Sequence, residues 1–303
     1  MKNFSARNNL EDSSSSGISS FSKEPVRELK ILTIGNSFAD SVFDSLQKIA
    51  ASDPACKVMM DKANIGGCSL EKHWNGHQEG LKPYSDGKSL EDMLKKEKWD
   101  IVTIQQASHF SWKKDTYQPY ADRIISLIRK DAPTAEIVIQ QTWSYNACDP
   151  RIAPGGDWGF DQNQMYEKLT QCYLDLAKQY HFRIIPSGYA VQTYRKALGK
   201  KLQEPDPASF KELKAGEIPF NPDVVGNFRW NIDEKTGERV FSPDCIHLNP
   251  NGEYLQGLVW YGFFFQKDPN AVAYMPADMS PDEAALLKQC ASQAIREFPG
   301  PGF

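Results

Sequence analysis

A serine near the start of the chain and an Asp/His pair near its end have the residue types of a nucleophilic acyl-transfer site. Ser37 follows the apolar run Ile31–Ile34 and Gly35, which permits a tight turn. Asp244 stands three residues before His247, just ahead of a helix-start pattern. In such a triad the carboxylate orients the imidazole, which takes the proton of the attacking hydroxyl. The chemistry requires the fold to bring the two segments together, although most of the chain separates them.

Each segment also has an ordinary structural explanation. Ser37 precedes a helical pattern, and serine commonly caps a helix N-terminus. Asp244 and His247, taken alone, are equally compatible with a surface carboxylate and a hydrogen-bonded histidine. The chemical interpretation is favoured because the serine follows a predicted strand, and parallel α/β sheets bind ligands at the carboxyl ends of their strands.

The remaining sequence predicts the scaffold that must position these residues. Residues 1–24 are polar and serine-rich, and we expect a disordered tail. Short apolar runs then alternate with amphipathic segments, which predicts an α/β domain over residues 25–303, with a mostly parallel five-stranded sheet and helices on both faces. The expected strands are Ile31–Ile34, Lys57–Met60, Asp100–Ile104, Glu136–Ile139 and Phe182–Ile185.

Helices are expected over residues 40–51, 90–98, 117–130, 164–180, 191–198 and 252–266. A capping box, with Ser280 as the N-cap and Glu283 at N3, predicts a terminal helix to about Phe298. The intervening stretch Gly199–Ile246 shows little periodicity and is too long for a plain connection, so a lid or binding loop is expected there.

Composition excludes several functional classes. The net charge of −4 and the scattered basic residues argue against a nucleic-acid partner, and no apolar run is long enough to span a membrane. The six cysteines form no Cys-x-x-Cys pair, which favours reduced thiols over a disulfide scaffold. Together with a start that lacks a secretory signal pattern, this predicts a cytoplasmic location.

No cofactor or metal is expected. His73 and His77 have the i, i+4 spacing of zinc ligands, but no glutamate follows His73 and Gly76 weakens the helix. The stretch Gly80–Ser89 does not have the spacing of a phosphate-binding loop, and no Gly-x-Gly-x-x-Gly follows the first strand.

Two short blocks carry a resemblance to a superfamily that is defined by four. Gly35-Asn36-Ser37 and Asp244-Cys245-Ile246-His247 match the first and last blocks of the SGNH (GDSL-like) hydrolases, and the chain resembles an uncharacterised branch of them. The resemblance implies a flavodoxin-like three-layer α/β/α sandwich and a Ser37–His247–Asp244 triad. It also implies that the N–H groups of Ser37 and of Gly67 (or Gly66) bind the oxyanion. In the third block the expected asparagine is missing, and His109 or Gln106 would have to supply its hydrogen bond.

The resemblance implies a serine esterase that acts on a small ester. We expect short acyl groups, O-acetyl groups on a carbohydrate among them. Substrate contacts are expected from polar and aromatic residues at strand ends: Asn36, Gln141, Trp143, Tyr145 and Trp158. Two alternatives remain open at this stage, which are a non-catalytic glycan-binding protein on the same scaffold and an acyltransferase.

Overall fold

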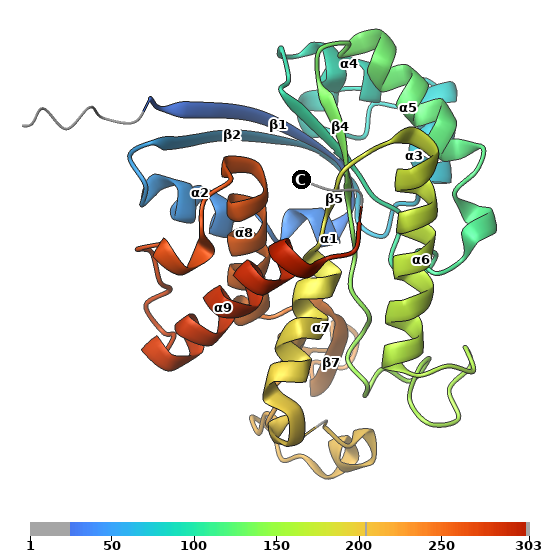
Figure 1. The fold of residues 1–303 in the computed structure, drawn as a ribbon. Coiled ribbons are helices and arrows are strands. Elements are labelled where there is room, and N and C mark those ends of the chain that lie inside the picture. The colour runs from blue at the N-terminus through green and yellow to red at the C-terminus, as the bar shows by residue number, and fades with distance from the viewer. Residues whose placement is uncertain (1–24, 204, 301–303) are drawn as a thin grey trace, which may run out of the picture.

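A five-stranded parallel sheet forms the centre of the molecule (Figure 1). The computed structural model describes residues 25–203 and 205–300, so the predicted tail, residues 1–24, lies outside the described part. The strands are β1 (Arg27–Gly35), β2 (Cys56–Asn64), β3 (Ile101–Ile104), β4 (Glu136–Gln140) and β5 (Ile184–Ile185). Their order is β2-β1-β3-β4-β5, with every neighbouring pair parallel. This is the flavodoxin-like order, which confirms the predicted fold class.

Helices cover both faces of the sheet (Figure 1). One layer holds α3 (Leu70–Gln78), α4 (Leu90–Lys95), α5 (Tyr120–Asp131) and α6 (Gln162–Tyr180). The other holds α2 (Phe43–Ala51), α7 (Ser187–Leu198), α8 (Pro250–Phe265) and α9 (Pro281–Glu297). Short 3-10 turns lie at Ser85–Gly87, Lys114–Thr116, Gly199–Lys201, Pro207–Glu212 and Pro269–Ala271. The helix expected over residues 40–51 is instead two pieces, α1 (Ser37–Asp40) and α2, so that a separate short helix follows β1.

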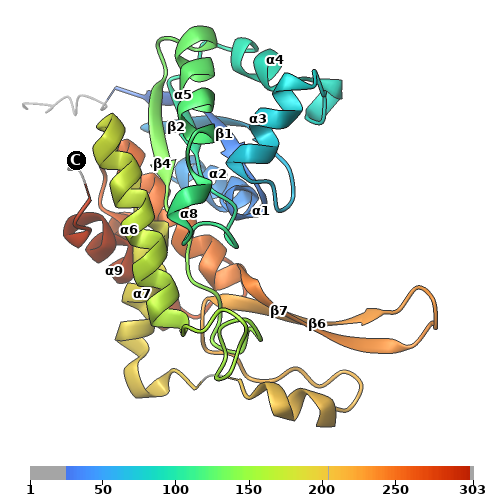
Figure 2. The same cartoon turned by 90° about the vertical axis from the view of Figure 1, so that its right-hand side faces the viewer.

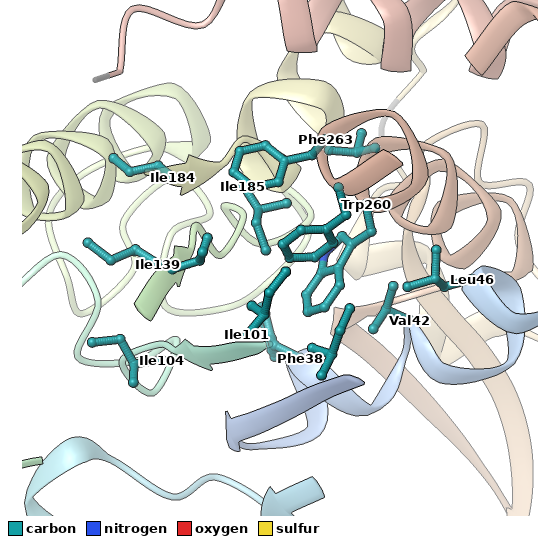
Figure 3. Close-up of a cluster of buried hydrophobic side chains, with 14 of the residues drawn as sticks. Phe38, Val42, Leu46, Ile101, Ile104, Ile139, Ile184, Ile185, Trp260 and Phe263 are labelled. Carbon is teal, nitrogen blue, oxygen red and sulfur yellow. The ribbon is translucent and has the colours of Figure 1, made fainter. Parts of the chain in front are cut away.

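Helix α8 is the centre of the second helical layer. Most of its residues are buried, as expected for a helix that is apolar on all sides. Trp260 and Phe263 of α8 face the strand residues Ile101 and Ile185 and the helix residue Phe38 (Figure 3). A Cβ on Gly257 would lie 2.7 Å from the Cβ of Ser45 in α2, so glycine permits this close helix packing. Each large apolar side chain buried here contributes about 1.5–3 kcal/mol.

The stretch before His247 contains a two-stranded antiparallel hairpin, which the sequence did not predict. Strands β6 (Val225–Ile232) and β7 (Arg239–Leu248) extend away from the body as an arm (Figure 2). The outer half of this arm is largely exposed, with Ile232 67% and Val240 46% accessible. Because exposed strands need no alternating apolar face, the pattern that identified the sheet strands is missing there.

The terminal helix is capped by only half of the predicted capping box. The Ser280 side chain accepts a hydrogen bond from the Glu283 backbone N–H at 3.2 Å. The Glu283 carboxylate accepts instead from the hydroxyl of Tyr194 at 2.7 Å, and so ties α9 to α7. Within residues 25–203 and 205–300, none of the helices has the length and apolar character needed to cross a membrane.

Candidate active site

The fold brings Ser37 and His247 together. Ser37 is the first residue of α1, directly beyond the carboxyl end of β1, and Asn36 caps this turn by accepting from the Phe38 N–H at 3.1 Å. The Ser37 Oγ lies 2.8 Å from the His247 Nε2. His247 lies near the end of β7, and its side chain is 35% exposed. The hydroxyl and the imidazole are therefore within proton-transfer distance and remain open to a substrate.

Asp244 holds the other side of the imidazole. Its Oδ2 lies 2.8 Å from His247 Nδ1, and its Oδ1 accepts from the backbone N–H groups of Ile246 and His247, each at 3.1 Å. Burial alone would raise the pKa of Asp244, but the hydrogen bonds from the His247 ring and from these two N–H groups outweigh it and hold the pKa below its ordinary value. Asp244 is therefore an anion at neutral pH and fixes the tautomer that leaves Nε2 free to accept a proton.

An irregularity in the hairpin allows the Asp244 and His247 side chains to meet. Residues i and i+3 of a regular strand point to opposite faces. Here Val225 pairs with Leu248 while Asn227 pairs with Asp244, so β7 has extra residues at this point. Gly226 stands opposite this bulge with a φ of +114°, which L side chains rarely adopt.

Two backbone N–H groups at the carboxyl ends of β1 and β2 are free to donate a hydrogen bond. Within the described chain, the N–H groups of Ser37 and Gly67 have no hydrogen-bond partner. Ser37 is the first residue of its helix, and Gly67 lies in the exposed turn after β2 with a φ of +62°. β2 is the neighbour of β1, so both groups lie at the same edge of the sheet.

Gln106 does not act as the predicted oxyanion donor, because all of its polar positions are occupied. Its Oε1 accepts from the N–H groups of Leu70 and Ala107, and its Nε2 donates to Thr116. His109, the other candidate, is half-buried against Phe110 and has no hydrogen bond to another described residue. Burial and the nearby cations lower the pKa of His109, which keeps its ring neutral with one N–H to donate.

Buried polar residues support the turn that presents Ser37. His73 Nε2 donates to the Gly35 carbonyl at 2.8 Å, and its Nδ1 lies 2.8 Å from the Tyr84 hydroxyl. Desolvation lowers the pKa of His73 to about 4, so the ring is neutral. Because both of its nitrogens are engaged, His73 cannot also ligate a metal with His77. Gln105, which precedes Gln106 at the end of β3, donates to Asn36 Oδ1 at 2.7 Å.

A cleft of about 400 Å³ opens beside the triad. Its lining residues have polar or charged side chains except for Leu248, and they are Ser37, Asp40, Ser41, Asn227, Arg229, Asp244, His247, Leu248 and Glu253. Asp40 is paired with Lys62 at 2.8 Å. Arg229 and Glu253 have no side-chain partner among the described residues, and burial raises the pKa of Glu253. The sequence analysis missed both residues, since a single arginine in an unassigned stretch and a single glutamate in a predicted helix give no signal.

Four of the five predicted substrate contacts are buried, so that part of the prediction is wrong. The fully buried residues are Asn36, Gln141, Trp143 and Tyr145. Trp143 stacks on Phe38 with ring centroids 4.2 Å apart and donates to the Ile246 carbonyl. Gln141 bonds Thr170 and Tyr189. Trp158 packs against Trp112 and does not line the cleft. The four buried side chains lie beneath the site at the strand ends, where they pack against or hydrogen-bond the residues that position it.

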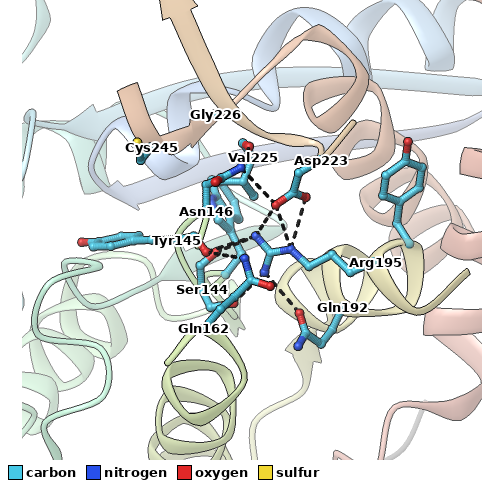
Figure 4. A network of polar contacts seen from close by, with 12 residues as sticks. Ser144, Tyr145, Asn146, Gln162, Gln192, Arg195, Asp223, Val225, Gly226 and Cys245 are labelled. Carbon is cyan, nitrogen blue, oxygen red and sulfur yellow. Dashed lines mark hydrogen bonds and ion pairs between the residues drawn. The ribbon is translucent and has the colours of Figure 1, made fainter. Parts of the chain in front are cut away.

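A buried ion pair fixes the base of the hairpin (Figure 4). Arg195 of α7 donates to Asp223 at 2.8 Å, and both side chains are 3% exposed. The same guanidinium donates to the Ser144 hydroxyl at 2.7 Å. Asn146 adds a bond to the Val225 carbonyl at 2.8 Å. The start of β6 is thereby tied to α7 and to the loop after β4, so the arm that carries Asp244 and His247 has a rigid foundation.

Comparison with solved structures shows the same fold in a DUF4886 family protein from Bacteroides uniformis. That crystal structure is 22% identical, covers 91% of this chain and 98% of its own, and has a TM-score of 0.72. A lipase/acylhydrolase from Enterococcus faecalis matches at 13% identity, 77% and 93% coverage and a TM-score of 0.45. An acetyl-xylooligosaccharide esterase from Geobacillus matches at 14% identity, 79% and 94% coverage and a TM-score of 0.42.

The curated proteins contain no match to this sequence. A scan against protein-family models, in contrast, matches residues 30–202 of the 303 to one family, described as a domain of unknown function, DUF4886. The matched segment runs from β1 through α7 and includes Ser37. The chain therefore belongs to the DUF4886 family.

Proposed function

We propose that this protein is a serine esterase that removes short acyl groups from a polyhydroxylated alcohol such as a carbohydrate. The observation that carries the proposal is the continuous contact from Ser37 Oγ to His247 Nε2 and from His247 Nδ1 to Asp244, at 2.8 Å each. A hydroxyl, a base and an orienting carboxylate in this order are the minimum machinery for nucleophilic acyl transfer.

The reaction has two halves. Ser37 attacks the ester carbonyl while His247 takes its proton, and His247 then returns that proton to the leaving alcohol. Water, deprotonated by His247, next attacks the acyl–Ser37 ester and releases the acid. Asp244 remains ionised and stabilises the imidazolium that forms in each half. The N–H groups of Ser37 and Gly67, with a ring N–H of His109, are the proposed donors to the oxyanion.

The cleft supports a polar substrate. Eight of its nine lining residues carry a polar or charged side chain, which suits a substrate with several hydrogen-bonding groups. Glu253 accepts hydrogen bonds and Arg229 donates them, and neither has a partner among the described residues that would compete with a substrate. A sugar alcohol presents hydroxyl groups that satisfy both kinds of group.

The test is hydrolysis of p-nitrophenyl acetate by the wild type and by Ser37→Ala. We expect the variant to lose at least about 10³-fold in kcat/KM. Ser41→Ala is the matched control. Ser41 lines the same cleft, but its hydroxyl donates to the Phe38 carbonyl and the Gln256 side chain and forms no hydrogen bond with His247. A fluorophosphonate probe should label the wild type and Ser41→Ala at Ser37. Equal hydrolysis by the wild type and Ser37→Ala would rule out the proposal.

A further inference from the structure

Two cysteines far apart in the sequence have their sulfur atoms in contact beside the triad. The Sγ atoms of Cys148 and Cys245 are 3.0 Å apart, across 97 residues of chain. Carbon atoms make their best nonbonded contact at roughly 3.5–4.0 Å, and sulfur is larger than carbon. The two sulfur atoms are therefore closer than their normal nonbonded contact distance, as expected for thiols placed to form a disulfide.

The backbone holds both cysteines in this arrangement. The Asn146 N–H donates to the Cys245 carbonyl at 2.8 Å, and the Cys148 N–H donates to the Asn146 side chain at 3.1 Å. Asn146 is in turn bonded to Val225 and belongs to the ion-pair network of Arg195 (Figure 4). The loop after β4 and the bulge of β7 are therefore fixed against each other at the place where the sulfurs meet.

The pair is set apart from the other buried thiols. Cys148 and Cys245 form a small apolar cluster with Phe228, covered by the partly exposed Phe210 and Phe241. Cys56, Cys172 and Cys290 belong to the main core, and among the described cysteines no other pair forms a contact of this kind between two thiols. Among the cysteines of the described chain, this pair therefore stands out by its contact between two sulfur atoms.

We propose that Cys148 and Cys245 form a disulfide that fastens the β7 bulge, and with it Asp244 and His247, to the loop after β4. Cys245 is the residue directly after Asp244 and two before His247. A bond at this position restrains both ends of the acid–base pair. The sequence analysis predicts reduced thiols throughout, and both cysteines are free in the structure, so the proposal makes this pair an exception to that prediction. The bond itself is independent of the proposed function, whereas its effect on catalysis rests on that function.

The oxidation balances with a small disulfide such as oxidised glutathione. One cysteine thiolate attacks a sulfur of that disulfide, which forms a mixed disulfide and expels one glutathione thiolate. The second cysteine thiolate then attacks the protein sulfur, forms the Cys148–Cys245 bond and expels the second glutathione. The two protein thiols lose two protons and two electrons, and oxidised glutathione takes these up to become two molecules of reduced glutathione. The hydrogen bond to Cys245 and burial both raise the pKa of Cys148, so exchange occurs when the aromatic cover opens.

The experiment uses the full chain, incubated with oxidised glutathione or with dithiothreitol. Free thiols are then alkylated under denaturing conditions, and the peptides are mapped by mass spectrometry. We expect a linked peptide containing Cys148 and Cys245 in the oxidised sample only, with Cys56, Cys68, Cys172 and Cys290 alkylated in both. Because the bond closes a long loop, reduction should lower Tm by roughly 5–10 °C. Cys148→Ala should abolish this redox-dependent shift, and Cys290→Ala should retain it.

Alkylation of both cysteines in the oxidised sample, or linkage of either to another cysteine, overturns the inference whatever the activity. The map of the wild type decides this even where Cys148→Ala does not fold. A linked peptide in a protein that fails to hydrolyse p-nitrophenyl acetate leaves the disulfide standing and removes the proposed function instead.

Discussion

Gly226 and Asn221 leave no room between them for a side chain. A Cβ on Gly226 would lie 2.7 Å from Asn221 Nδ2. This amide cannot move away freely, because it donates to the carbonyls of Val225 and Gly226 at 3.0 and 3.2 Å. The backbone opposite the β7 bulge is therefore closely packed, and the bulge is what lets Asp244 meet His247.

Gly226→Ala should consequently damage both stability and activity. The positive φ alone costs an L residue about 1–2 kcal/mol, and the clash with Asn221 adds to it. A shift of the bulge by about 1 Å should lower kcat/KM by about 10²-fold. Gly237→Ala is the matched control: Gly237 lies in the turn of the same hairpin with a φ of +71° and open space around its Cβ position. Chemical unfolding and ester hydrolysis should show a larger loss for Gly226→Ala than for Gly237→Ala, and equal losses would contradict the packing argument.

Asp244→Asn and Glu253→Gln should change stability in opposite directions. The pKa of Asp244 is lowered, so its carboxylate stabilises the folded state above the ordinary value of 3.8, and this contribution is lost as the pH falls below it. The pKa of Glu253 is raised above 4.5, so its ionised form opposes folding above that pH. At pH 7, Asp244→Asn should lower Tm and Glu253→Gln should raise it. Both differences from the wild type should shrink as the pH falls below 4, which thermal scans across pH would measure. A difference that keeps its size at low pH argues against either linkage.

His73 should make the protein sensitive to mild acid. Its pKa of about 4, against an ordinary 6.5, means that the unfolded chain binds the proton more tightly. Stability should therefore fall as the pH drops from 6.5 towards 4, by about 3 kcal/mol in total. His73→Gln should be less stable at pH 7 and should show a flatter dependence over this range. His77→Gln, which changes a partly exposed histidine of the same helix, should follow the wild-type curve.

Arg229 should affect the choice of ester more than the chemistry. Loss of a charge-assisted hydrogen bond costs about 1.5–3 kcal/mol. Arg229→Met should therefore lower kcat/KM for an acetylated oligosaccharide by about 10-fold or more, and by less for p-nitrophenyl acetate. Arg239→Met, at the far end of the same hairpin, is the control and should leave kcat/KM unchanged for both esters. A uniform loss on both esters would assign Arg229 a structural role.

The sequence predicts those features of the molecule that depend on neighbouring residues, and it does not predict those that depend on contacts between distant segments. Ser37 was found because a buried strand and Gly35 leave a local pattern, and the Asp244/His247 spacing is equally local. The β7 bulge and the Arg195–Asp223 pair leave no local pattern in the sequence, since they depend on which distant segments lie side by side. Trp143 looked like a substrate contact because aromatic residues at strand ends often are; that its ring stacks on Phe38 follows only from the packing of α1.

The proposed nucleophile, Ser37, and its proposed base, His247, lie on opposite sides of the point in the sequence where the family match ends. A polypeptide that stopped near residue 202 would keep the sheet, Ser37 and the turn after β2, yet it would have no group to deprotonate the hydroxyl. Under the proposed function, the serine of such a shortened chain would be inactive. Under the proposed function, ester hydrolysis therefore depends on the hairpin that follows the matched core as well as on the core itself.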